Sequence, residues 1–185
     1  MPAWGWIVIA IAVVAVVVIA WWTTRRRRTT GLKSTFGPEY DRTVKESDNR
    51  RHAESELAQR RDRRARLDIR PLTPAAQARY QGSWREIQLL FVDEPDRALA
   101  DADRVVTQVM GERGCPMDDF EQRSADVSVD HPDVVQNYRA AHGISMASDQ
   151  GAASTEDMRQ GMVHYRALFE ELLGGPEGSD VREAR

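Results

Sequence analysis

A long apolar run opens the chain and gives way abruptly to polar sequence. Residues 4–22 read WGWIVIAIAVVAVVVIAWW, nineteen residues without a charge. At about 1.5 Å rise per residue, a helix of this length spans roughly 28 Å, close to the hydrocarbon thickness of a bilayer. We therefore expect residues 1–24 to form a transmembrane helix.

Tryptophans stand at both ends of the apolar run. Trp4 and Trp6 lie at its start, and Trp21 and Trp22 lie at its end. Indole rings favour the membrane interface, so this arrangement predicts a span bracketed by two aromatic belts. A cleaved signal peptide would need a basic start, a shorter apolar core and a small-residue cleavage site. The pattern instead favours a signal-anchor that is retained.

Four arginines, Arg25, Arg26, Arg27 and Arg28, follow the run almost at once. Positively charged flanks stay in the cytoplasm, so the N-terminus is expected outside and the bulk of the chain inside. This predicts a single-pass protein of a bacterial plasma (inner) membrane. Either the cluster only sets the orientation of the span, or it also attracts anionic lipid headgroups, at about 1 kcal/mol per basic residue.

The next segment, residues 25–70, is expected to be a basic juxtamembrane linker followed by a helical stalk. Residues 29–34 look like a flexible joint, and residues 39–66 have a helical pattern that is polar on all faces. Acidic residues precede basic ones by four positions, which favours a helix. The expected ion pairs are Asp41/Lys45, Glu46/Arg50, Glu56/Arg60 and Asp62/Arg66.

From residue 71 onward, apolar residues recur at helical spacing. Thr73 and Pro74 suit a helix start, and Ser154 with Asp157 suits another. The apolar positions predict four amphipathic helices and a short helix within 117–125, joined by loops that include 147–154. The largest stripe residues are Tyr80, Trp84, Ile87 and Phe91, then Leu99, Val106 and Met110, then Val135 and Tyr138, and finally Met158, Met162, Tyr165, Phe169 and Leu172.

These periods predict an all-α fold in which residues 71–174 form a helical bundle domain. Residues 175–185 are rich in small and charged side chains, and we expect a disordered tail there. Nothing in the sequence has the alternation typical of strands.

Charge is distributed unevenly between the segments. Residues 25–70 carry fifteen basic and eight acidic side chains, whereas residues 71–185 carry eleven and twenty-one. A basic segment (residues 25–70) next to an acidic segment (residues 71–185) favours contact with a charged surface. The basic run 60–66 is a candidate for lipid or nucleic-acid phosphates, but no aromatic residues interleave with it for base stacking, which argues against nucleic acid.

Candidate chemistry is sparse. Acidic residues between 118 and 130, together with His131 or His142, could bind a small ligand or perform acid–base work. However, Asp residues at helix starts ordinarily act as caps, and no Cys/His spacing typical of a metal site is present. Cys115 is the single cysteine, which excludes an intramolecular disulfide. We therefore predict no catalytic, metal or cofactor-binding residues, and no enzyme.

Four stretches, FGPEYDR (36–42), LDIRPLT (67–73), 118–142 and 156–173, resemble a family of uncharacterised membrane-anchored helical proteins of high-GC bacteria. The similarity covers nearly the whole chain. Members are sometimes labelled secreted proteins, and the resemblance implies no known activity. They carry an aromatic residue where Cys115 stands, which argues against a role for the thiol.

The sequence thus predicts a membrane-anchored protein whose cytoplasmic helical domain binds or scaffolds an unidentified protein partner. The alternative is a small-ligand receptor or enzyme using the acidic 118–130 segment with His131 or His142. A third interpretation is a lipid-surface or nucleic-acid binder that uses the basic stalk.

Overall fold

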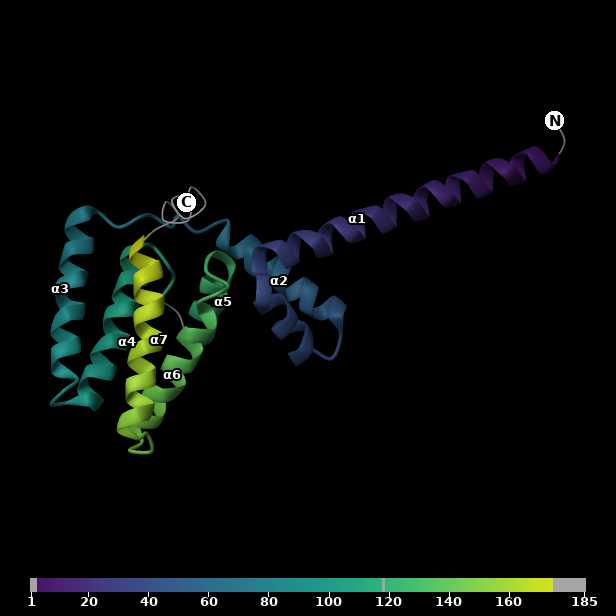
Figure 1. Cartoon of the computed structure of the whole chain (residues 1–185). Helices are drawn as coiled ribbons and strands as arrows, with labels where there is room; N and C mark the ends of the chain where they lie inside the picture. Colours follow the sequence, from purple (N-terminus) through teal and green to yellow (C-terminus); the bar gives the residue numbers. More distant parts are fainter. Residues whose placement is uncertain (1–2, 118, 175–185) are drawn as a thin grey trace, which may run out of the picture. The chain divides into compact units, whose positions relative to one another are not determined.

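The computed structural model describes the backbone of residues 3–117 and 119–174, and within residues 3–28 only the side chains of Val13, Ala15, Val16, Ile19 and Trp22. All regular structure in these ranges is helical, which confirms the predicted all-α class. The helices are α1 (Ala3–Glu46), α2 (Arg50–Arg64), α3 (Pro74–Leu90), α4 (Pro95–Glu112), α5 (Phe120–Asp130), α6 (Val135–Asp149) and α7 (Thr155–Gly174) (Figure 1).

The chain divides into two compact units, Met1–Ala58 and Gln59–Arg185. The boundary falls inside α2, whereas the sequence pattern placed the end of the stalk at residue 70. Each unit is described by itself below.

The first unit is built around a sharp break in α1. Gly37 has φ 46° and ψ −124°, a backbone conformation that favours glycine because it lacks a Cβ atom. Pro38 follows, and proline disfavours helical geometry in the residue before it. Beyond the break the helix continues to Glu46, and α2 then starts after Asn49, whose Oδ1 accepts from the Arg51 amide at 2.9 Å.

Two expectations for this region are wrong. Residues 29–34 lie within α1 rather than in a flexible joint, and the helix expected over 39–66 is interrupted between Glu46 and Arg50. That interruption separates the predicted Glu46/Arg50 pair, and Arg50 pairs instead with Glu54 at 3.0 Å.

Nor is the segment polar on all faces. Leu32, Phe36 and Tyr40 recur every four residues along α1, and all three are buried, as are Ala53 and Leu57 of α2. The phenol of Tyr40 donates to Glu54 at 2.8 Å, so α1 and α2 contact each other on this side. A helix pair with its own buried stripe is therefore present where the sequence predicted a solvated stalk.

The backbone of residues 4–22 is helical as part of α1. The side chains of Trp4, Trp6, Trp21 and Arg25–Arg28 lie outside the described residues, while Trp22 is 52% exposed. Among the residues whose side chains are described, no helix is sufficiently long and apolar to cross a membrane.

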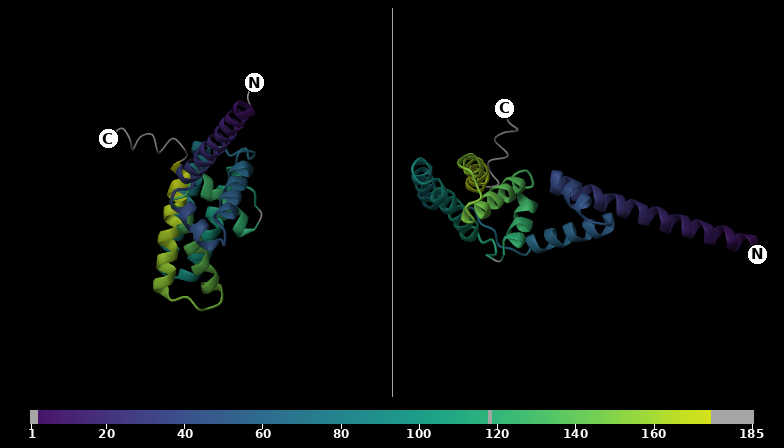
Figure 2. Two further views of the ribbon diagram at one scale, coloured as in Figure 1. Left: turned by 90° about the vertical axis from the view of Figure 1, so that its right-hand side faces the viewer. Right: turned by 90° about the horizontal axis from the view of Figure 1, so that it is seen from below.

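In the second unit α4 is the central helix. It packs against α3, α6 and α7, while α6 packs against α7 and α5 joins the group through α6. Figures 1 and 2 show α3, α4, α6 and α7 running side by side. The buried residues include Tyr80, Trp84, Ile87, Leu99, Val106, Met110, Val135, Tyr138, Met158, Met162, Tyr165, Phe169 and Leu172, so the predicted stripes are confirmed, apart from Phe91, which is half-buried.

Local signals explain several helix ends. Thr73 caps α3 by accepting from the Ala76 amide at 3.2 Å, and Ser154 caps α7 by accepting from the Asp157 amide at 3.2 Å, both as predicted. Two bounds differ from prediction: α5 runs on to Asp130, and α6 extends to Asp149 into the expected loop. Tertiary packing overrides weak local propensity at such ends.

Close packing of α7 depends on Gly161. A Cβ atom at this position would lie 2.8 Å from Leu99 Cδ1 and 3.2 Å from Ile144 Cγ2. The missing side chain therefore lets α7 approach both α4 and α6, and this approach fixes the position of α7 in the unit.

Candidate binding groove between α3 and α7

One face of the second unit is left partly open. α3 and α7 each pack on α4, and their direct contacts include a stacked pair, Trp84 and Phe169, whose ring centroids lie 4.6 Å apart. Gln77 adds a hydrogen bond from Nε2 to the Leu173 carbonyl oxygen at 3.2 Å. The start of α3 thus lies beside the end of α7, so the two helices are antiparallel and form the walls of a groove.

Two pockets occupy this groove on either side of the aromatic stack. The larger has a volume of about 470 Å³ and the smaller about 210 Å³, and Trp84 lines both. The wall from α3 consists of Gln81, Trp84, Arg85, Gln88 and Phe91. The wall from α7 consists of Arg159, Met162, Val163, Arg166, Phe169, Glu170, Leu173 and Gly174.

Helical periodicity accounts for both walls. The α3 residues follow one another at steps of one, three or four, and the α7 residues do the same, so each set is one stripe of its helix. Each stripe adjoins the buried core stripe, and Trp84 and Phe169 belong to both. The floor of the groove is therefore aromatic and aliphatic, and polar side chains line its rims.

Trp84 carries a polar group without a partner. Only 6% of Trp84 is exposed, and its Nε1 forms no hydrogen bond within the described structure. An indole nitrogen can only donate, and a buried donor left unpaired costs about 1–3 kcal/mol. Nε1 itself is almost fully covered, and four other polar atoms of the described residues, Thr107 Oγ1, Arg113 Nε, Ser124 Oγ and His142 Nδ1, are likewise buried and unpaired, so the unpaired indole does not by itself mark a binding site.

The charged side chains at the rims are mainly cationic. Arg159 makes two bonds with Glu156, and the guanidinium holds the pKa of that carboxyl down at about 2. Arg166 lies 3.8 Å from Glu170. Arg85 is exposed and pairs with no carboxylate in the described part of the chain. Two of the three rim arginines therefore already lie beside a carboxylate, and Arg85 supplies the positive charge that remains without one.

The acidic segment predicted as an alternative site is arranged differently. Asp118 lies outside the described residues. Asp119 caps α5 by accepting from the Gln122 amide at 2.8 Å, Asp126 accepts from Gln122 Nε2 at 3.0 Å, and Asp130 pairs with Arg64. Asp119, Asp126 and Asp130 therefore serve in a cap, a hydrogen bond and an ion pair, and Glu121 is exposed on α5.

His131 and His142, the two histidines of that alternative site, contact different side chains. His131 Nδ1 lies 3.0 Å from Glu171 Oε1, on a side chain that is only 10% exposed. His142 stacks on Phe120 with ring centroids 3.7 Å apart, and its Nδ1 lies 3.8 Å from Asp103, too far for a hydrogen bond. His142 Nδ1 is buried and has no hydrogen-bond partner among the described residues.

Across the described residues, no three His, Cys, Asp or Glu side chains converge in a way that could hold a metal ion. Cys115 is partly buried, and this burial raises the pKa of its thiol. A raised pKa leaves little thiolate at neutral pH, and the thiolate is the reactive form.

The sequence prediction missed the groove, although it named Trp84, Met162 and Phe169 as core residues. The groove residues that the prediction did not name include Arg85 and Val163. Each is the sequence neighbour of a predicted core residue. The available signal was an apolar stripe on α7 widened by Val163 and flanked by arginines in an otherwise acidic domain. Which two stripes face each other depends on the tertiary arrangement.

Comparison of the chain with models of protein families, with curated protein sequences and with solved structures found no match.

Proposed function

We propose that the chain is a single-pass membrane-anchored protein whose helical domain binds a partner protein through the groove between α3 and α7. Residues 4–22 form the anchor, the four tryptophans mark its interfaces, and Arg25–Arg28 hold the remainder in the cytoplasm. The same arginines contact anionic lipid headgroups.

The groove is the single observation that carries the binding role. It combines an aromatic floor, two adjoining pockets and rims that carry arginines. Protein-binding sites are enriched in aromatic residues and arginine, and both are concentrated here.

Binding is favoured over catalysis by the chemistry of the lining. General acid–base catalysis needs titratable groups positioned around the reacting atoms. The described carboxylate in the lining, Glu170, is exposed and lies next to Arg166, and the acidic 118–130 segment uses its carboxylates elsewhere. The proposed role is therefore that of a tethered binding or scaffolding module and not of an enzyme.

Site-specific photocrosslinking in native membranes tests this role. A photoreactive side chain at Val163, in the groove, is expected to yield a crosslinked product of defined mass. The same group at Gln160, exposed on α7 outside the groove lining, is the matched control. Equal crosslinking at both positions, or none at Val163, would contradict the groove as the binding site.

The anchor is tested independently with reporters fused to the C-terminus. A reporter active only in the cytoplasm should work, and one active only in the periplasm should fail. Activity of the periplasmic reporter, or a mature product lacking residues 1–22, would rule out the proposed topology.

A further inference from the structure

The walls of the groove restrict the backbone conformation of what binds there. Both walls are helices, whose backbone N–H and C=O groups are already used within each helix. An extended segment lying in the groove would bury its own backbone polar groups without partners. A helix satisfies these groups internally, so a helical occupant avoids this cost.

The spacing of the pockets restricts the side chains of such a helix. From Gln81 to Phe91 the α3 wall extends about 15 Å, and from Arg159 to Gly174 the α7 wall extends about 22 Å. A helix of roughly 14 residues matches this length. On α7 the larger pocket is lined within residues 169–174 and the smaller within residues 159–166, so apolar anchors about two helical turns apart, at positions i and i+7 and about 10 Å from each other, suit the two pockets.

The rims of the groove restrict the charge of the occupant. Arg85 and Arg166 flank the stack from opposite walls, and Arg159 stands further along α7. Arg85 has no carboxylate partner in the described residues, so a carboxylate supplied by the occupant would pair with it without breaking an existing ion pair. Guanidinium groups bind carboxylates through two parallel hydrogen bonds, which adds geometric specificity.

From these features we infer that the groove binds an amphipathic α-helix of a partner protein, with apolar anchors at i and i+7 flanked by Asp or Glu. This inference rests on the proposed binding function and specifies its partner. Residues 175–185 of the chain itself also contain acidic side chains and follow Gly174 at the edge of the larger pocket. Their only branched aliphatic side chain is Val181, which is insufficient for two apolar pockets.

The test uses a fluorescent, alanine-rich helical peptide of about 14 residues with Leu at i, i+3, i+4 and i+7 and Glu on both flanks. A matched peptide carries Lys in place of each Glu. Fluorescence anisotropy with the full chain in nanodiscs gives both dissociation constants. The acidic peptide is expected to bind at least about tenfold more tightly than the basic one, as close charge pairs across an interface require.

Three variants assign the binding to the groove. Val163→Asp should abolish binding of the acidic peptide, and Arg85→Glu should reverse the preference between the peptides. Arg104→Glu changes the charge equally at a site on α4 that is 62% exposed and outside the groove lining, and it should leave both affinities unchanged. Circular dichroism of each variant verifies that the helices are retained.

Several results would overturn the inference. These are equal affinity for the two peptides, no effect of Arg85→Glu, or binding only after removal of residues 175–185, which would assign the groove to the chain's own C-terminal segment. Self-association that Val163→Asp abolishes would assign it to a second copy. If Val163 crosslinks a partner in membranes while the acidic peptide fails to bind, the proposed function stands and only the partner chemistry is wrong.

Discussion

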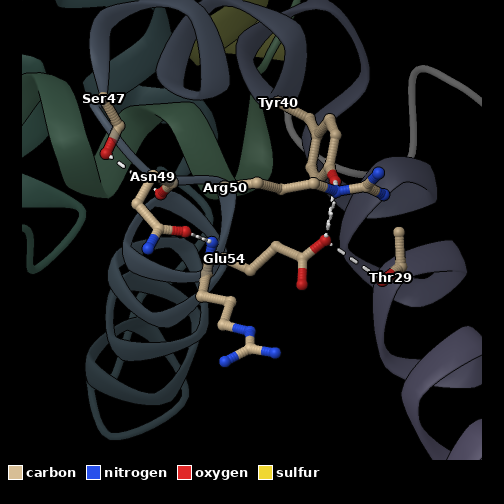
Figure 3. A network of polar contacts seen from close by, with 7 residues as sticks. Thr29, Tyr40, Ser47, Asn49, Arg50 and Glu54 are labelled. Atoms are coloured by element: carbon tan, nitrogen blue, oxygen red, sulfur yellow. Dashed lines mark hydrogen bonds and ion pairs between the residues drawn. The ribbon is translucent and has the colours of Figure 1, made fainter.

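Polar and aromatic side chains are plentiful both in the contact region between α1 and α2 and in the groove between α3 and α7, but the polar groups are paired to different extents. In the first region Glu54 accepts from Thr29 at 3.1 Å, from Tyr40 at 2.8 Å and from Arg50 at 3.0 Å (Figure 3). In the groove, Trp84 Nε1 and Arg85 lack such partners in the described residues.

The two regions differ in how far their polar groups are satisfied. Glu54 is half-buried and ties together the part of α1 before Gly37, the part after it, and α2, and paired polar groups of this kind hold segments in one arrangement. In the groove, the unpaired Trp84 Nε1 costs about 1–3 kcal/mol. The network therefore has a structural role, whereas the proposed binding role belongs to the groove.

The largest expected effect is on the aromatic floor of the groove. Phe169→Ala should lower the free energy of unfolding of a Gln59–Arg185 fragment by about 3 kcal/mol, the low end of the range for Phe-to-Ala changes, because the ring also borders the open groove. Thermal unfolding followed by circular dichroism measures this. A loss below about 1 kcal/mol would mean that the Trp84–Phe169 stack contributes little to the core.

The next effect concerns the paired region. Glu54→Ala removes the acceptor of three donors and should destabilise the α1–α2 contact by roughly 1–3 kcal/mol, whereas Glu54→Gln keeps an acceptor oxygen and should cost less. Amide hydrogen exchange of residues 38–58 in the full chain provides the measurement. Identical exchange in both variants would show that the network does not hold the helices together.

This network also predicts a pH dependence. Burial opposes ionisation of Glu54, but hydrogen bonds from Tyr40, Arg50 and Thr29 outweigh it, so the pKa lies below its ordinary value of 4.5. Because the folded-state pKa is depressed, the stabilisation is complete above the ordinary value and is lost as the pH falls through the folded-state pKa. Exchange in residues 38–58 should therefore accelerate, after correction for intrinsic rates, only below about pH 4.5. Glu54→Gln should remove this dependence.

The break in α1 is expected to respond through its backbone. Gly37→Ala adds a Cβ atom at φ 46° and ψ −124°, where no neighbouring atom lies within 4 Å, so the cost is backbone strain alone, about 1–3 kcal/mol. The same exchange measurement should show faster exchange around residues 38–46. Gly31→Ala, in the regular part of the helix, is the matched control and should be neutral or slightly stabilising.

The predictability of the two regions from sequence also differs. The apolar stripes through Trp84 and Met162 predicted α3 and α7 because helical periodicity is local. The α1–α2 contact depends on Glu54 meeting Thr29, twenty-five residues earlier in the chain, and no local pattern encodes such pairing. The break after Glu46 did have a local signal, since Asn49 is a good N-cap residue, but the charge pattern across it suggested a continuous helix.

The smallest change in stability gives the sharpest test of the comparison. Trp84→Phe keeps an aromatic ring against Phe169 but removes the unpaired Nε1 donor, so the lost packing and the removed desolvation cost oppose each other. We expect the free energy of unfolding to change by less than about 1 kcal/mol, measured by thermal unfolding. Tyr80→Phe is the control: its hydroxyl donates to Glu112 at 2.7 Å, so its removal should destabilise the unit. If Trp84→Phe destabilises the unit as much as Tyr80→Phe does, the unpaired nitrogen carries no cost, and the distinction between the paired network around Glu54 and the unpaired indole fails.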